Sequence, residues 1–134
     1  MNVAAIVGPS GAGKTTLLAL LIRHFTGRGR SVAAVKHTHH ALTSERRGDT
    51  EVFLLAGAMP AVLAGDGEAI VFTGDSVTRM TYDDPGNLIA HLGTDIVLVE
   101  GFKQRTDWPR IEINIASRPS LEEVLNILDR IWRS

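Results

Sequence analysis

Eight consecutive residues near the start of the chain have the types and spacing of a phosphate-binding loop. The Walker A pattern G-x-x-x-x-G-K-S/T is matched by Gly8-Pro9-Ser10-Gly11-Ala12-Gly13-Lys14-Thr15. Glycines let successive backbone N–H groups point at phosphate oxygens, and a following helix adds partial positive charge at its first turn. Lys14 is then expected at the β- and γ-phosphates, with the Thr15 hydroxyl on magnesium. The motif predicts binding of a nucleoside triphosphate with Mg²⁺.

Two carboxylates complete this candidate site. Glu100 follows the hydrophobic run Ile96–Val99, and a carboxylate at the C-terminal end of a buried parallel strand lies where open α/β sheets bind ligands. Asp49 follows a long polar loop, from which it could approach a γ-phosphate or cap a helix. We therefore predict catalytic roles for Lys14, Asp49 and Glu100, and magnesium coordination by Thr15, Asp49 and Glu100.

A basic and histidine-rich segment forms a third candidate, Lys36-His37-Thr38-His39-His40. Zinc coordination is disfavoured because the chain has no cysteine, the segment has no acidic residue, and neighbouring His39 and His40 diverge in an extended chain. Contact with an anion or a partner is favoured.

Only three of the fourteen basic residues are lysines, and Lys36 and Lys103 both adjoin candidate phosphate-binding segments, as Lys14 does. We predict that Lys36, His37 and Lys103 contact the nucleotide.

The hydrophobic pattern predicts the elements that position these residues. Val3–Val7 and Ser31–Val35 are buried strands, and Lys14–Phe25 has apolar residues at helical spacing, so the chain opens with a βαβ unit. Asp49 or Thr50 then caps a helix that runs to about Ala58, with Val52, Phe53, Leu55 and Ala56 partly inward.

The middle and end of the chain change character. Three β-prone runs separated by the turn pairs Asp66-Gly67 and Gly74-Asp75 predict an antiparallel meander over about residues 60–82. The later predicted elements are a helix at Pro85–Leu92, strands at Asp95–Val99 and Ile111–Ile115, and a helix that Ser120 caps with Glu123. The sequence predicts one α/β domain over residues 1–134, a mainly parallel sheet extended by the meander.

Composition limits the classes of partner. The 134 residues contain fourteen Lys and Arg against fifteen Asp and Glu, a formal net charge of -1, which argues against a nucleic-acid binder. No apolar run reaches the roughly 18–20 residues of a membrane span, and the N-terminus has no positively charged segment of a signal peptide. We expect a cytoplasmic protein without membrane contact.

Four motifs make the chain resemble the family of molybdopterin-guanine dinucleotide biosynthesis protein B, MobB. They are Gly8–Thr16, Val35–His40, Gly48-Asp49-Thr50 with the later Ala56-Gly57-Ala58, and Leu98–Lys103. The first is common to all proteins with a phosphate loop, whereas the other three in this order are more specific.

The resemblance implies a P-loop fold, a homodimer, and binding of GTP with at most slow Mg²⁺-dependent hydrolysis. It also implies partnership with the guanylyltransferase that joins GMP to molybdopterin, or with molybdopterin itself. Phosphates would bind Gly11, Gly13, Lys14, Thr15 and Thr16. The chain has no Asn-Lys-x-Asp signature for guanine, so residues 114–119 are the candidates for a base contact.

Two other functions fit the same residues. In a small P-loop kinase, Asp49 or Glu100 would accept the proton of a substrate hydroxyl. In a metal-insertion GTPase, the Lys36–His40 loop would handle the metal.

Overall fold

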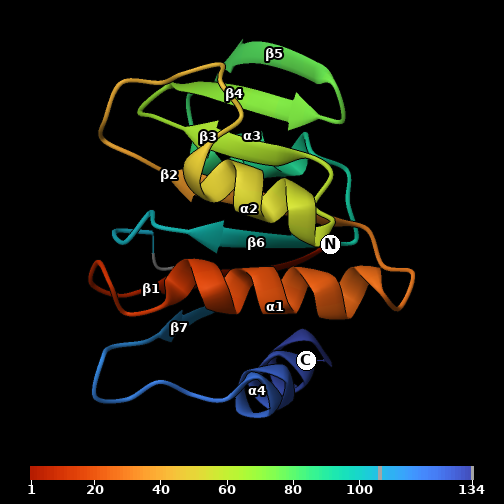
Figure 1. Ribbon diagram of the computed structural model, residues 1–134, viewed down its shortest axis with the longest axis vertical. Coiled ribbons are helices and arrows are strands. Elements are labelled where there is room, and N and C mark those ends of the chain that lie inside the picture. Colours follow the sequence, from red (N-terminus) through yellow and green to blue (C-terminus); the bar gives the residue numbers. More distant parts are fainter. Residues whose placement is uncertain (106, 134) are drawn as a thin grey trace.

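The computed structural model describes residues 1–105 and 107–133, over which the chain forms one seven-stranded sheet in the order β5-β4-β3-β2-β6-β1-β7 (Figure 1). The elements in chain order are β1 (Asn2–Val7), α1 (Lys14–Thr26), β2 (Val32–His37), α2 (Gly48–Ala56), β3 (Ala61–Ala64), β4 (Glu68–Thr73), β5 (Ser76–Thr81), α3 (Pro85–Ala90), β6 (Ile96–Glu100), β7 (Arg110–Glu112) and α4 (Leu121–Arg133).

The centre of the sheet is parallel and buried on both faces. β6 lies between β1 and β2, with Leu98 opposite both Ala4 and Ala34. Apolar side chains of α1, α2 and α4 pack on one face of the sheet, and those of α3 pack on the other. Coverage of both faces explains why these strands read as unbroken apolar runs.

The predicted meander is present and continues the same sheet. β3 runs parallel to β2, whereas β4 is antiparallel to both β3 and β5. Figure 1 shows β5 at the far edge, opposite β7 and α4. The antiparallel strands therefore widen the sheet on the side away from the phosphate-loop helix.

The second strand is longer than predicted. β2 runs to His37 rather than ending at Val35, because Lys36 and His37 pair with Leu63 and Ala64 of β3. The two polar residues thus belong to the strand's C-terminal end and not to the loop after it. Their backbone positions are held by the sheet.

The helix after the polar loop differs from the prediction in its cap and its buried face. α2 begins at Gly48 with Arg47 as N-cap, so Asp49 lies in the first turn and does not cap the helix. Phe53 and Ala56 are buried as expected, but Leu55 is 73% exposed and Val52 38% exposed. The buried residues of α2 are Thr50, Phe53 and Ala56, which are three positions apart and form one narrow face of the helix. Val52 and Leu55 lie outside that face.

The C-terminal region confirms the predicted cap and shortens the predicted strand. The Ser120 Oγ accepts a hydrogen bond of 3.1 Å from the Glu123 N–H at the start of α4. The Trp132 indole donates to the Val3 carbonyl at 3.1 Å, which ties the end of α4 to β1. β7 runs from Arg110 to Glu112, so of the strand expected at Ile111–Ile115 only Ile111 and Glu112 belong to it. None of the described helices is long and apolar enough to cross a bilayer.

Candidate nucleotide-binding cleft

The phosphate loop joins the end of β1 to the start of α1. Gly13 is the N-cap of α1 with φ 95°, and Gly11 has φ 81°, both in the region that favours glycine. The Lys14 ammonium donates to the Gly8 carbonyl and, at 3.4 Å, to the Pro9 carbonyl. The lysine therefore lies against its own loop at the positive end of the helix, which is the arrangement that binds an anion.

Glu100 lies beside the helix start from the neighbouring strand. The Thr15 hydroxyl donates to its Oε1 at 3.4 Å, and Glu100 as a whole is only 5% exposed. Among the described residues its buried Oε2 has no hydrogen-bond partner. Burial raises the pKa of Glu100, and the positive charges of Lys36 and Lys14 oppose that shift only in part.

Lys36 bridges the two predicted carboxylates. Its ammonium donates to Asp49 and lies 3.8 Å from Oε2 of Glu100. Burial acts to lower the pKa of Lys36, but the bond to Asp49 and the charges of Glu100 and Asp49 raise it overall. The tertiary structure thus gathers Thr15, Lys36, Asp49 and Glu100 at one end of the sheet.

The oxygen atoms in this group fit a magnesium ion. Mg²⁺ prefers carboxylate and hydroxyl oxygens together with water and phosphate. Thr15, Asp49 and Glu100 supply one hydroxyl and two carboxylates, and the buried Oε2 of Glu100 has a free acceptor site among the described residues.

These residues open into a large cleft of about 1450 Å³. Its volume exceeds the roughly 300–1,000 Å³ of ordinary small-molecule pockets, so it has room for more than one ligand group. Most of the predicted binding residues line it: Ser10, Gly11, Gly13, Lys14, Thr15, Thr16, Lys36, His37, Asp49, Glu100 and Lys103. Gly8, Pro9 and Ala12 are outside the lining set, and the Ala12 side chain is part of the core instead.

One further cleft residue comes from the segment after β7. The Arg118 guanidinium donates to the Gly11 carbonyl at 3.1 Å and lies close to Gly13. Residues 114–119 were expected near the base, whereas Arg118 lies at the phosphate loop. Nothing in the local sequence distinguishes Arg118 from the other arginines, because its position depends on the path from β7 to α4.

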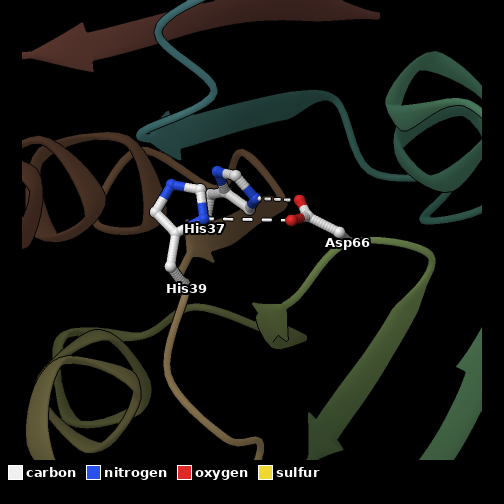
Figure 2. Close-up of side chains that lie close together, drawn as sticks. All are labelled: His37, His39 and Asp66. Carbon is white, nitrogen blue, oxygen red and sulfur yellow. Dashed lines mark hydrogen bonds and ion pairs between the residues drawn. The ribbon is translucent and has the colours of Figure 1, made fainter.

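The cleft is also lined, beside β2 and β3, by a cluster of two histidines and an aspartate (Figure 2). His37 Nε2 is 2.9 Å from Asp66 Oδ1, and His39 Nδ1 is 3.8 Å from Asp66 Oδ2. The hydrogen bond to His37 lowers the pKa of Asp66. Sequence reasoning treated Asp66 only as a turn residue. The parallel register of β2 and β3 was the missing signal, because it places the turn after β3 beside the end of β2.

An aromatic group supports this part of the cleft. The Phe102 ring stacks on His37 with centroids 4.1 Å apart, and Trp108 meets Phe102 edge-on at 5.9 Å. Arg105 lies 4.7 Å from the Trp108 ring centre and pairs with Asp84 at 3.0 Å. Trp108 is therefore half-buried and packed between Phe102 and Arg105.

Comparison with known proteins identifies relatives of the chain. Residues 3–130 match the family model described as molybdopterin guanine dinucleotide synthesis protein B, MobB. The molybdopterin-guanine dinucleotide biosynthesis adapter protein of Haemophilus influenzae is 37% identical over 100 residues, 74% of this chain and 56% of the relative. The Escherichia coli adapter protein of the same name is 35% identical over 98 residues, 70% of this chain and 55% of the relative. The chain spans about half the length of these relatives.

A solved structure supports the fold. Bacillus subtilis MobB aligns with a TM-score of 0.54 and 23% sequence identity, covering 84% of this chain and 68% of that one. The predicted P-loop α/β architecture is confirmed by this likeness together with the sheet described above.

Proposed function

This chain belongs to the MobB family, and from that premise we propose that it is an accessory protein of molybdopterin-guanine dinucleotide synthesis that binds GTP with Mg²⁺. The observation that carries the proposal is the meeting of the phosphate loop with Thr15, Asp49 and Glu100 in one cleft. The relatives named adapter proteins of this biosynthesis support the accessory role.

The chain's own residues account for triphosphate binding. The loop from Gly8 to Gly13, the first turn of α1 and the Lys14 ammonium would hold the phosphates. Thr15, Asp49 and Glu100 would hold Mg²⁺, which neutralises phosphate charge when bound. Thr16, Lys36, His37 and Lys103 complete the proposed contacts from the cleft wall.

We propose that hydrolysis is slow at most. A general base must be able to take a proton from the attacking water, but the Asp49 carboxylate is engaged by Lys36, and Glu100 lies buried between Thr15 and Lys36. The protein would then hold the nucleotide without rapid turnover. A guanylyltransferase that acts on molybdopterin would carry out the transfer, with this chain as a cytoplasmic homodimer.

Calorimetric titration tests the nucleotide assignment. GTP, GDP and ATP are titrated into the protein with and without Mg²⁺. We expect GTP·Mg²⁺ to bind most tightly, and EDTA to weaken GTP binding because the phosphate charge is then less well neutralised. Equal affinity for ATP and GTP would contradict the guanine assignment.

Lys14→Ala tests the phosphate loop itself. The variant should lose at least tenfold in GTP affinity while keeping the wild-type melting temperature, because the hydrogen bonds of Lys14 within residues 1–105 and 107–133 go to carbonyls of its own loop. Arg23→Ala, an exposed position on the same helix, is the matched control and should bind GTP normally. Unchanged affinity in Lys14→Ala would refute the phosphate-loop assignment.

A further inference from the structure

The cluster of His37, His39 and Asp66 has the composition of a transition-metal site (Figure 2). One donor atom from each residue lies within 4.8 Å of the other two. Two imidazoles and a carboxylate form a ligand set that zinc and related divalent ions accept. The sequence alone disfavoured this chemistry, in part because the histidine segment itself contains no acidic residue. The turn between β3 and β4 supplies that residue.

We propose that His37, His39 and Asp66 bind a divalent transition-metal ion of the zinc class. Bonds of about 2.0–2.2 Å to a tetrahedral zinc place the donors about 3.4 Å apart. His37 Nε2 lies 2.9 Å from Oδ1 of Asp66 and His39 Nδ1 lies 3.8 Å from its Oδ2, and one ligand atom from each of the three residues lies within 4.8 Å of the other two. Small side-chain rotations would bring all three donors to coordination distance.

One ligand is held rigidly and two can adjust. The His37 side chain is 12% exposed, stacks on Phe102 at an interplanar angle of 8°, and lies against Gly101, where an added Cβ would come within 2.9 Å of His37 Cβ. The side chains of His39 and Asp66 are 80% and 79% exposed. An anchored imidazole with two mobile partners allows the metal to enter from solvent and the ligands to close around it.

The proposed site would keep an open coordination position. Three protein ligands leave the fourth tetrahedral position of zinc to water or to an added ligand. His37, His39 and Asp66 all line the cleft that Lys14 and Thr15 also line. The ion would therefore add a positive charge and an exchangeable ligand position to the cleft, beside β2 and β3, whereas the phosphate loop follows β1.

Zinc binding by the untagged full chain tests the proposal. ZnCl₂ is titrated against the protein in competition with a chromogenic chelator, and we expect one equivalent with a dissociation constant below 10 µM, on the order of affinities expected for three protein ligands. His39→Ala and Asp66→Asn should each weaken binding at least tenfold. Both alter exposed side chains, so the fold should be kept. Co²⁺ in place of zinc should give the visible absorption of a tetrahedral site.

Two controls separate the site from its surroundings. His40→Ala removes a neighbouring histidine that lines the cleft but lies outside the cluster, and it should bind zinc as the wild type does. Lys14→Ala should also keep zinc binding while losing GTP, so failure of the metal site and failure of the nucleotide site are distinguishable. Absence of stoichiometric zinc binding, or an equal loss in His40→Ala and His39→Ala, would overturn the proposal.

Discussion

The Glu100 carboxylate shows how the environment of a single residue defines its chemistry. The four residues of β6 before Glu100 are fully buried, so the strand runs through the core and ends with the Glu100 carboxylate at the cleft. The Lys36 ammonium lies 3.8 Å from Oε2 of Glu100 and partly compensates the carboxylate charge, but burial still raises the pKa of Glu100. Burying a carboxylate costs free energy unless a cation or hydrogen-bond donor pairs with it. A magnesium ion at the unpaired oxygen of Glu100 would reduce that cost, which supports the proposed role of Glu100 as a magnesium ligand.

Glu100→Gln should change how stability depends on pH. Because the folded pKa of Glu100 is raised above the ordinary 4.5, the folded state binds this proton more tightly than the unfolded state. Its contribution to stability is present below the unfolded pKa and is lost as pH rises through the folded pKa. Glutamine does not titrate, so the variant should gain stability relative to wild type as pH increases from 4 to 7.

Urea unfolding at a series of pH values measures this difference. Glu122→Gln, an exposed position in the first turn of α4, serves as the matched control and should parallel the wild type. A constant difference between Glu100→Gln and wild type from pH 4 to 7 would show that Glu100 titrates normally.

At the scale of elements, the phosphate loop depends on a close approach between distant segments. Gly8 lies where an added Cβ would be 2.2 Å from the Ile113 carbonyl oxygen, just beyond β7. The Ile113 N–H in turn donates to the Val7 carbonyl at 2.9 Å. The first glycine of the loop is therefore required for packing against the β7 region, in addition to its place in the phosphate motif.

Gly8→Ala should destabilise the fold by about 2–3 kcal/mol, since a backbone carbonyl cannot move away as a flexible side chain could. Gly29→Ala is the matched control, because Gly29 has φ 78° but no atom of the described residues within 4 Å of an added Cβ. This substitution should cost only about 1 kcal/mol of backbone strain. Urea unfolding at neutral pH measures both. Equal losses in the two variants would mean that the contact with Ile113 contributes nothing.

At the scale of the whole molecule, the sheet has two open edges, and their chemistry differs. β5 is a six-residue edge strand with Val77 43% exposed, whereas β7 has three residues that include the Arg110–Glu112 ion pair. Both edges carry an ion pair, since Arg79 of β5 pairs with Glu68, but a longer edge offers another chain more unpaired N–H and C=O groups than a very short one. The β5 edge is the better candidate for the proposed homodimer.

Val77→Lys tests this assignment by placing a charge on the β5 edge. The wild type should sediment at twice the 14.5 kDa chain mass, and the variant should shift toward the monomer because a lysine opposes strand pairing. Glu112→Lys on β7 is the control at the other edge and should leave the dimer intact. Sedimentation velocity at micromolar concentration distinguishes these outcomes, and a dimer that survives Val77→Lys would exclude the β5 edge.

Local sequence determined the phosphate loop, because residues 8–15 are contiguous and their function depends on local backbone conformation and the adjoining helix. Apolar runs and helical spacing were also sufficient for the parallel core, turn residues for the meander, and the spacing of Ser120 and Glu123 for the cap. The hydrophobic pattern was wrong about the end of β2, where Lys36 and His37 join the sheet, and about Leu55, because a polar strand end and an exposed helix face depend on neighbouring elements.

Only the tertiary structure decided which distant residues meet. Parallel strands bring their C-terminal ends to one edge of the sheet, and that edge joins Thr15, Lys36, Asp49 and Glu100. The register of β2 with β3 likewise brings Asp66 to His37 and His39, although Asp66 follows His37 by 29 positions in the sequence. The sequence determined which groups could bind phosphate and metal, and strand pairing decided which of them share a site.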